Sequence, residues 1–323
     1  MITILGGGVC GLSMAAECVA RGADVTVIDP AGGVGDHACS WWAGGMLAPE
    51  CEGVLTEDNV VAQGRKAALW WADHGADVTH KGTVVVALGR DQAELSTFAR
   101  RAPMATWLAR DGLADLEPHL ADQISRALFI ETEAHLDPRK TLVVLEHTLK
   151  AQGVTFATQA ALQGQVIDCR GLAARDALPD LRGVKGEMLV VHCPDVILSR
   201  PVRLLHPRFP LYVVPRGDGV FMLGATQIES GQRHRASVRS VMELMNAAYA
   251  LHPAFGEAEL IEIGVDARPA FPDNQPRIRK SGGRIYANGL FRHGFLLAPA
   301  LARMTANLVI DGTIPEVWYE TDN

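Results

Sequence analysis

Hydrophobic and polar positions follow a regular pattern over the first thirty residues of the chain. Residues 2–5 form a short run of β-branched and aliphatic residues, and residues 24–28 form a second run that ends at Asp29. Between these runs, residues 12–21 place apolar side chains at helical spacing, and Gly22 follows as a helix stop. The pattern predicts a strand, a helix and a second strand, which is the β-α-β unit of a parallel sheet.

The remainder of the chain has two kinds of pattern. From residue 186 short strands follow one another at close spacing, which is typical of an antiparallel sheet. Strands are predicted over residues 82–88, 127–130, 154–157, 165–169, 187–191, 196–199, 211–214, 220–224, 260–265 and 284–288. Helices are predicted over residues 59–74, 91–101, 104–110, 138–152 (with Asp137 as N-cap), 236–251 and 295–310. A chain of 323 residues exceeds one ordinary domain core, so the sequence predicts a mixed α/β fold with two lobes.

Composition and charge exclude several classes of protein. Hydrophobic residues make up 48% and charged residues 21% of the chain, as in globular domains. The net charge of −7 disfavours a nucleic-acid-binding surface, and no apolar run reaches the roughly 18 residues of a membrane span. The first residues lack the basic and apolar segments of a secretion signal. The six cysteines show no C-x-x-C or zinc-finger spacing, so we expect reduced thiols in a cytoplasmic protein. Neither a nucleic acid nor a membrane is expected as a partner.

A glycine motif joins the first predicted strand to the first predicted helix. Residues 6–11 fit G-x-G-x-x-G, in which Gly6 permits the tight turn, Gly8 lets the backbone approach a pyrophosphate and Gly11 lets helix and strand pack closely. The pyrophosphate lies on the helix N-terminus, and Asp29 accepts hydrogen bonds from the adenosine ribose. The alternative is a glycine-rich turn in another kind of βα unit. The motif predicts a dinucleotide site without determining which dinucleotide is bound.

Three later features favour a flavin over a nicotinamide. A glycine-containing loop at residues 289–294 leads directly into an apolar helix, whose N-terminus favours the negative charge that a flavin gains on reduction. Arg268, expected in a strand-exit turn stiffened by Pro269 and Pro272, presents a planar fork that can bind a carboxylate. Tyr212 could donate a hydrogen bond to the same carboxylate. For each residue taken alone, the alternative is a structural role, with Arg268 as a surface or ion-pair arginine and Tyr212 as an ordinary strand aromatic residue.

Several stretches of this chain resemble one family of enzymes. GGGVCG, WAGGMLAPE, GVKGEML, LYVVPRGDGVFMLGAT, DARPAFPDNQPRI and GLFRHGFLLAPA are similar to segments of the D-amino-acid oxidase family of FAD-dependent amine oxidases, and in particular to its glycine oxidase branch. The resemblance runs nearly end to end. It implies a Rossmann-like FAD-binding domain formed by residues 1–80, 136–185 and 263–323. It also implies a discontinuous, antiparallel-sheet substrate domain formed by residues 81–135 and 186–262.

The resemblance also implies site residues. Arg268 would hold the substrate carboxylate, and Arg292, Tyr212 and Gln227 would face the substrate. The implied FAD contacts, together with the glycines of the motif, are Gly6, Gly8, Val9, Cys10, Gly11, Asp29, Pro30, Cys39, Ser40, Gly44, Gly45, Met46, Leu290, Phe291, Arg292, His293, Gly294, Phe295 and Leu296. No metal ligand is expected.

Three positions depart from the family pattern. Gln227 stands where the glycine oxidase branch carries a methionine, and a polar residue there would change the size and hydrogen bonding of the substrate pocket. His293 stands in place of the more usual asparagine. Residues 158–165 form a shorter segment than in the family, which trims a hairpin. The exact amino-acid substrate is therefore left open.

Three hypotheses for the function follow from the resemblance. In the first, the protein is an FAD-dependent oxidase of glycine or another small amino acid. It yields the imine or the α-keto acid (glyoxylate from glycine), reduces O₂ to H₂O₂ and feeds thiamine thiazole biosynthesis. In the second, a dehydrogenase with the same fold passes electrons to another acceptor. In the third, the chain is a catalytically silent flavin-binding protein, which the presence of both Arg268 and Arg292 argues against. The expected partners are FAD, a small amino acid and O₂, and a homo-oligomer is left open.

Overall fold

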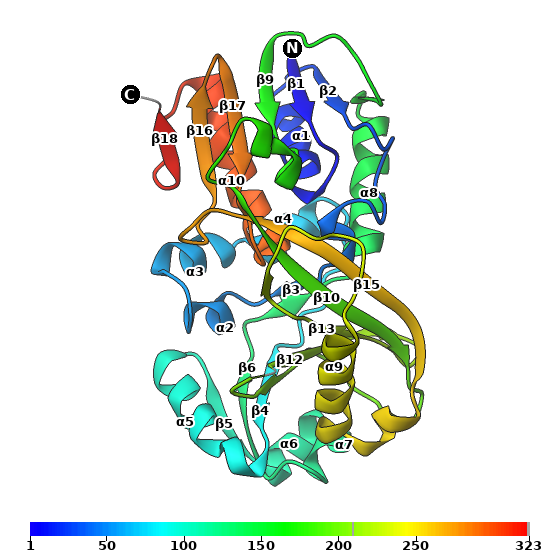
Figure 1. Cartoon of the computed structure of the whole chain (residues 1–323). Coiled ribbons are helices and arrows are strands. Elements are labelled where there is room, and N and C mark those ends of the chain that lie inside the picture. The colour runs from blue at the N-terminus through cyan, green and yellow to red at the C-terminus, as the bar shows by residue number, and fades with distance from the viewer. Residues whose placement is uncertain (209, 322–323) are drawn as a thin grey trace.

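The computed structural model describes residues 1–208 and 210–321. Its two halves lie one above the other in Figure 1, and the first strand β1 (Ile2–Leu5) and the last strand β18 (Tyr319–Thr321) both lie in the upper half. Each half is built on one large sheet. The long strands β10 (Arg182–His192) and β15 (Glu259–Ala270) pair with each other and run from the lower sheet toward the upper half.

A seven-stranded, mostly parallel sheet forms the upper half. Its strands come from the beginning, the middle and the end of the chain. In spatial order they are β18 (Tyr319–Thr321), β16 (Arg277–Ser281), β17 (Arg284–Asn288), β9 (Gln165–Asp168), β1 (Ile2–Leu5), β2 (Val25–Ile28) and β8 (Thr155–Ala157). Because β1 pairs in parallel with both β2 and β9, the predicted β-α-β unit is confirmed.

Helices cover the upper sheet. The three long ones are α1 (Val9–Ala20), α8 (Pro138–Ala151) and α10 (Gly294–Asp311). The shorter elements of this half are η1 (Cys39–Trp42), β3 (Met46–Leu47), α2 (Pro49–Gly53), α3 (Asp58–Gly64), α4 (Ala67–Asp73), β7 (Ala134–His135) and η3 (Gly171–Asp176). In the described part of the chain, α10 is long and apolar enough to cross a membrane. It is nevertheless 61% buried inside the molecule, where it packs against α1, as a core helix does.

A nine-stranded sheet forms the lower half. In spatial order its strands are β14 (Ile228–Glu229), β10, β13 (Val220–Gly224), β12 (Leu211–Gly217), β11 (Val202–Leu205), β4 (Thr83–Ala87), β6 (Arg126–Ile130) and β5 (Thr106–Ala109), with β15 beside β10. All pairs are antiparallel except β11 with β4, which confirms the predicted antiparallel sheet. The helical elements here are η2 (Gly89–Asp91), α5 (Gln92–Arg101), α6 (Arg110–Leu116), α7 (Pro118–Ala121), α9 (Val238–Leu251) and η4 (Pro253–Glu257).

Two long strands cross the predicted limits between the domains. β10 begins at Arg182, before the limit at residue 186, and β15 continues to Ala270, beyond the limit at residue 263. The two strands form one continuous ladder, so no sharp break separates the halves here. The assignment of residues 1–80, 136–185 and 263–323 to one domain and of the rest to another stays a prediction.

Two predicted elements in the lower half are wrong. The helix over residues 104–110 is the strand β5, because its backbone pairs with β6 in register and tertiary pairing overrides the local pattern. The strand over residues 196–199 is absent because side chains satisfy its N–H groups. Ile197 donates to the His119 ring at 3.3 Å and Ser199 donates to the Glu117 carboxylate at 3.0 Å. The strand β11 follows instead, at a position where none was predicted.

The predicted helix over residues 59–74 is two helices in the structure. α3 ends at Gly64 and α4 begins at Ala67. A Cβ at Gly64 would lie 2.8 Å from the Leu296 side chain, so the helix can approach α10 only through a glycine. The break therefore follows from close packing against α10, which the local hydrophobic pattern does not record.

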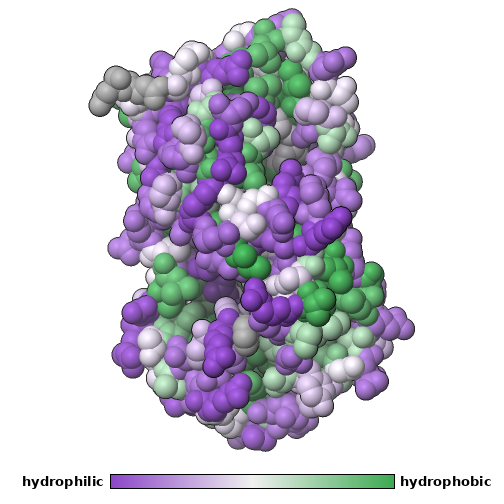
Figure 2. Space-filling view, viewed as in Figure 1, coloured by the Kyte–Doolittle hydropathy of each residue, from purple (hydrophilic) through white to green (hydrophobic). Residues whose placement is uncertain are grey.

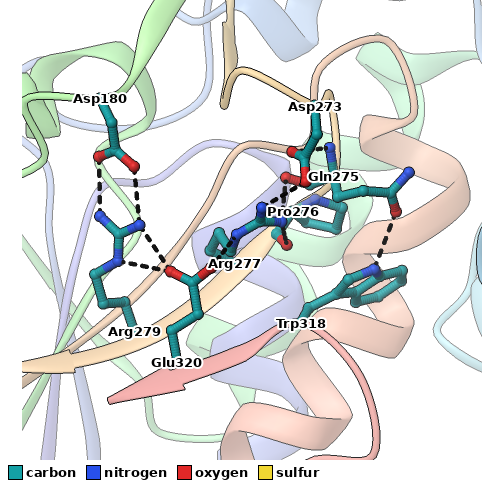
Figure 3. Close-up of polar contacts among 8 residues, drawn as sticks. All are labelled: Asp180, Asp273, Gln275, Pro276, Arg277, Arg279, Trp318 and Glu320. Carbon is teal, nitrogen blue, oxygen red and sulfur yellow. Dashed lines mark hydrogen bonds and ion pairs between the residues drawn. The ribbon is translucent and has the colours of Figure 1, made fainter. Parts of the chain in front are cut away.

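Charged side chains hold the last strand to the upper sheet (Figure 3). Glu320 of β18 contacts Arg277 at 2.5 Å and Arg279 at 2.7 Å, both from the neighbouring strand β16. Asp273 pairs with Arg277 at 2.5 Å, and Asp180 makes two contacts of 2.9 Å with Arg279. We call these five residues the edge cluster. Their carboxylates are between 39% and 47% exposed, so the cluster lies in contact with water.

Candidate functional site

A cavity of about 1270 Å³ lies between the two halves and is lined by residues of both sheets. Figure 2 shows the molecular surface hollowed near the middle of the molecule, where the halves meet. One part of the cavity wall is the glycine loop after β1, and another is the loop before α10. A third part is formed by the strands of the lower sheet. The cavity thus joins the predicted dinucleotide site to the predicted substrate side chains.

The glycine loop has the geometry that the motif requires. Gly6 adopts φ +97°, and a Cβ at Gly11 would overlap the carbonyl oxygen of Gly6. Gly7 donates its N–H to Asp29 Oδ2 at 2.6 Å, so the acidic residue at the end of β2 also shapes the loop. The first turn of α1 leaves backbone N–H groups without an intrahelical partner. This end of the cavity therefore favours an anionic group.

The small-residue stretch after η1 is held against the lower sheet. Ser40 accepts the N–H of Val9 at 3.3 Å, which ties this stretch to α1. Gly44 lies against the Tyr212 ring, since a Cβ there would be 2.9 Å from it. Arg216 of β12 donates to the Gly44 carbonyl at 2.8 Å, and burial lowers the pKa of this guanidinium to about 10. The stretch thus connects the glycine loop to β12.

Arg268 lies inside β15, opposite Val184 of β10, and not in a strand-exit turn as predicted. The correction has a simple cause, because the ladder with β10 continues through Pro269. A Cβ at Gly186 would overlap the guanidinium, so Arg268 lies directly against the backbone of β10. Its Nη1 donates to the Thr226 carbonyl at 3.1 Å. The backbone of β10 and of the connection between β13 and β14 therefore fixes the position of this guanidinium.

Acidic side chains close to Arg268 along the strands are paired with other groups. Asp266 binds Arg233 at 2.6 Å. Glu187 binds Lys185 at 2.8 Å; its burial disfavours the charged form, but its hydrogen-bond donors hold the pKa of the carboxyl below the usual value. Among the described residues, no carboxylate forms an ion pair with Arg268. Arg268 is thus a cavity-lining cation that lacks an internal counter-charge.

Tyr212 and Gln227 lie on the cavity wall in different settings. Tyr212 of β12 is opposite Gly224 of β13, and burial raises the pKa of its phenol, so the hydroxyl stays neutral and can donate a hydrogen bond. Gln227 follows Thr226, the residue whose carbonyl binds Arg268, and its side chain is exposed. Tyr212 is therefore the more enclosed of the two predicted substrate contacts.

A buried carboxylate binds two arginines and a histidine from two distant segments. Glu52 of α2 pairs with Arg203 of β11, with Arg292 at 2.7 Å and with His293 Nε2 at 2.9 Å. Burial opposes its ionisation, yet the neighbouring Arg292 and Arg203 guanidinium groups hold the pKa of Glu52 well below its usual range. All four residues line the cavity, and we call them the Glu52 cluster.

The structure brings nearly all the predicted site residues to one place. Gly11 is the exception, because it packs against Gly6 behind the loop. The predicted residues that line the cavity are Gly6, Gly8, Val9, Cys10, Asp29, Pro30, Cys39, Ser40, Gly44, Gly45, Met46, Tyr212, Gln227, Arg268, Leu290, Phe291, Arg292, His293, Gly294, Phe295 and Leu296. Their contacts with a cofactor or a substrate stay predictions.

Four polar residues at or beside the cavity are not among the predicted site residues, namely Glu52, Arg203, Glu187 and Thr226. Glu52 and Arg203 belong to the Glu52 cluster, whereas Glu187 positions Thr226 by accepting its hydroxyl at 3.0 Å. A signal for two of them is present in the sequence, since Arg203 interrupts the run V-R-L-L and Glu187 interrupts G-E-M-L-V-V. A charged residue within an apolar strand is buried only when it is paired, so such positions indicate a site.

Comparison with known proteins identifies the family. The profile of the DAO family, described as FAD dependent oxidoreductase, matches residues 1–308. The chain belongs to the DAO family. A thiamine biosynthesis oxidoreductase ThiO of Rhizobium etli is 49% identical over 315 residues, which is 96% of each chain. A glycine oxidase of Bacillus licheniformis is 25% identical over 98% of this chain and 95% of its own. The solved glycine oxidase of Geobacillus kaustophilus superposes with a TM-score of 0.81 at 23% identity, covering 95% of this chain and 94% of that one.

As a DAO-family member the protein is an FAD-dependent oxidoreductase, and the residues present fit this cofactor. The cavity reaches both the N-terminus of α1, which suits the pyrophosphate, and the N-terminus of α10, which suits the flavin end. Between them, Gly44 and Gly45 leave backbone without side chains at the wall; a Cβ at Gly45 would overlap the carbonyl of Leu136. These positions have no room for larger side chains, as a site that holds a flat ring against the backbone requires.

Proposed function

We propose that this protein oxidises glycine or another small amino acid, reduces O₂ to H₂O₂ and supplies thiamine thiazole biosynthesis. The likeness to a thiamine biosynthesis oxidoreductase and to a glycine oxidase supports the substrate class and the pathway. The observation that carries the proposal is Arg268, a cavity-lining guanidinium without an ion-pair partner in the described chain. A planar, unpaired guanidinium in a shielded cavity is a binding group for a carboxylate.

Each side chain near Arg268 has a role in this reaction. Arg268 binds the substrate carboxylate, while the backbone of Gly186 and the carbonyl of Thr226 fix the guanidinium. The neutral Tyr212 hydroxyl donates a hydrogen bond to the same carboxylate. These contacts hold the α-carbon in one orientation, and positioning of this kind supplies most of the rate. When bound, FAD supplies the acceptor for the hydride that leaves the α-carbon.

The reaction balances without a base from the protein, provided that the amine arrives neutral. The amino acid loses a hydride from the α-carbon and a proton from nitrogen, which leaves the imine. Water then hydrolyses the imine to the α-keto acid and ammonia, and glycine gives glyoxylate. One O₂ takes up the two electrons and two protons and forms one H₂O₂.

The proposal is tested by mixing the oxidised holoenzyme anaerobically with glycine, sarcosine and D-alanine while the flavin absorbance is recorded. We expect at least one of the three to bleach the flavin, and air to restore the absorbance with release of H₂O₂. No bleaching by any of them would contradict amino-acid oxidation. A catalytically silent flavin protein would give that result.

The electron acceptor is tested in the second step of the same experiment. If substrate bleaches the flavin and air does not restore the absorbance, the enzyme is a dehydrogenase that uses a quinone or a protein as acceptor. Addition of a soluble quinone to the reduced protein would then restore the absorbance. The two steps thus separate the choice of substrate from the choice of acceptor.

The cysteines support a cytoplasmic location for this function. All six thiols are free. A protein of a reducing compartment keeps its cysteines in this form. Fractionation of cells that express the chain would test the location.

A further inference from the structure

Three of the arginines that line the cavity, Arg203, Arg268 and Arg292, differ in their partners. Arg203 and Arg292 both bind the Glu52 carboxylate, and His293 binds it as well at 2.9 Å. Arg268 has no such partner in the described chain and donates only to the Thr226 carbonyl. Two of the three guanidinium groups are therefore already engaged by a buried carboxylate, and one is free for a ligand.

We propose that Glu52 is a specificity-determining residue that restricts the cavity to amino acids with a single carboxylate. The inference rests on the proposed function and deepens it. By pairing with Arg203 and Arg292, Glu52 leaves Arg268 as the guanidinium without a carboxylate partner among these three. A second carboxylate meets Arg203 and Arg292 already paired with Glu52. It would have to compete with the Glu52 carboxylate for both guanidinium groups, so its binding is disfavoured.

The burial of Glu52 makes this discrimination effective. Its side chain is only 9% exposed, and its pKa is held well below the usual range because Arg292 and Arg203 outweigh the effect of burial. Glu52 is therefore ionised at neutral pH. Water screens a buried ion pair poorly, so Glu52 competes strongly with an incoming carboxylate for Arg203 and Arg292. His293 contacts Glu52 Oε2, whereas Arg203 contacts Oε1, so the two residues do not compete for one oxygen.

The test compares the binding of acetate and malonate, which differ by one carboxylate, to the oxidised holoenzyme. Binding is followed through the flavin absorbance and needs no turnover. Glu52→Gln keeps the shape of the side chain but removes the negative charge and releases two guanidinium groups. We expect the affinity for malonate relative to acetate to rise about 10-fold or more. An unchanged ratio in a folded, FAD-loaded variant overturns the proposal.

A matched control and an opposite variant complete the design. Glu50→Gln removes a carboxylate from the same helix, but Glu50 pairs with Arg65 outside the cavity, so the ratio should stay at the wild-type value. Arg203→Gln leaves Glu52 with less positive charge beside it and should lower the ratio. If Glu52→Gln fails to hold FAD, Arg203→Gln decides the question, because an unchanged ratio in that variant overturns the proposal.

The failure of this inference can be told apart from the failure of the proposed function. If Glu52→Gln binds malonate better but no amino acid reduces the flavin, the role of Glu52 stands and the proposed reaction is refuted. Reduction by glycine together with an unchanged binding ratio would do the reverse. In the active enzyme, Glu52→Gln should also raise kcat/KM for iminodiacetate relative to sarcosine, which differ by the same carboxylate.

Discussion

Two groups of arginine and carboxylate side chains in this molecule differ in how their charges are matched. In the edge cluster, Arg277 and Arg279 meet Asp180, Asp273 and Glu320 (Figure 3), so each guanidinium contacts two carboxylates. The cluster joins β18 and the loop before β16 to the rest of the sheet. None of its five residues lines the large cavity.

The cavity wall has the opposite balance. Glu52 alone serves Arg203 and Arg292, and Arg268 has no counter-ion among the described residues. A half-buried cation without a partner is costly, because it has lost part of its water and gained no opposite charge. Such an arrangement is useful only when a ligand supplies the missing charge. Guanidinium groups that are fully paired with carboxylates thus indicate a structural role. A guanidinium without a carboxylate partner indicates a ligand-binding role.

Replacement of Arg268 should produce the largest functional effect. In Arg268→Ala the substrate carboxylate loses its charged partner, and the loss of such a hydrogen-bonded pair costs about 2–5 kcal/mol. We therefore expect kcat/KM for glycine to fall about 100- to 1000-fold, mainly through KM, at 1.4 kcal/mol for each factor of ten. FAD should remain bound, as judged by the flavin absorbance after gel filtration.

The edge cluster supplies the control for this prediction. Arg279→Ala removes a guanidinium with two bound carboxylates at a site outside the cavity, so kcat/KM should match the wild-type value. Loss of FAD in Arg268→Ala would show that Arg268 stabilises the fold, and would remove the distinction between the two regions.

Removal of an arginine should destabilise the fold more in the buried Glu52 cluster than in the exposed edge cluster. Arg203→Met leaves Glu52 buried with one guanidinium fewer, and we expect the free energy of unfolding to fall by about 2 kcal/mol, as for a lost charged hydrogen bond. Arg279→Met acts on carboxylates in contact with water and should cost about 1 kcal/mol or less. Urea unfolding of the two holoproteins measures both values. Equal losses would mean that burial does not separate the clusters.

Local patterns predicted those parts of the fold that depend on neighbouring residues. The glycine loop, α1 and β2 follow from motif and periodicity. So does α8, where Asp137 accepts the N–H groups of Arg139 and Lys140 as the expected N-cap. β5 was missed because its state is decided by pairing with β6, and a four-residue apolar segment does not record its partner. Arg268 was placed in a turn because Pro269 suggested a strand end that the ladder with β10 overrides.

Charge pairing across the cavity could not be predicted from the sequence. The predicted site residues, apart from Gly11, all line the cavity, and they follow from the motifs and the family resemblance. Glu52 is separated from Arg203 by 151 positions and from His293 by 241 positions, so nothing local relates them. Arg292 was expected to face the substrate, and only the folded chain shows that Glu52 also holds it. The partner of a charged group is a property of tertiary structure.

The pH dependence of stability offers a smaller test of the Glu52 cluster. Because the folded-state pKa of Glu52 is lowered, its contribution is fully present above the unfolded value of about 4.3 and is lost as the pH falls through the folded value. The difference in unfolding free energy between wild type and Glu52→Gln should therefore decrease below about pH 5, by at most about 1.4 kcal/mol per pH unit. Urea unfolding at pH values from about 3 to about 7, which include the range where carboxyl groups titrate, measures this difference. A difference that grows on acidification would refute the ionised state of Glu52.

The two clusters should also differ in how salt changes the stability lost on mutation, which is the smallest effect expected. Glu320→Gln removes a carboxylate that is 40% exposed, and we expect a loss of about 0.5 kcal/mol at low ionic strength. At about 1 M salt the Debye length is about 3 Å, so most of this loss should disappear. The loss caused by Glu52→Gln should change little, because its side chain is 9% exposed and salt does not reach it. If both losses shrink equally in salt, the Glu52 cluster is open to solvent, and Glu52 would not hold Arg203 and Arg292 against a competing carboxylate.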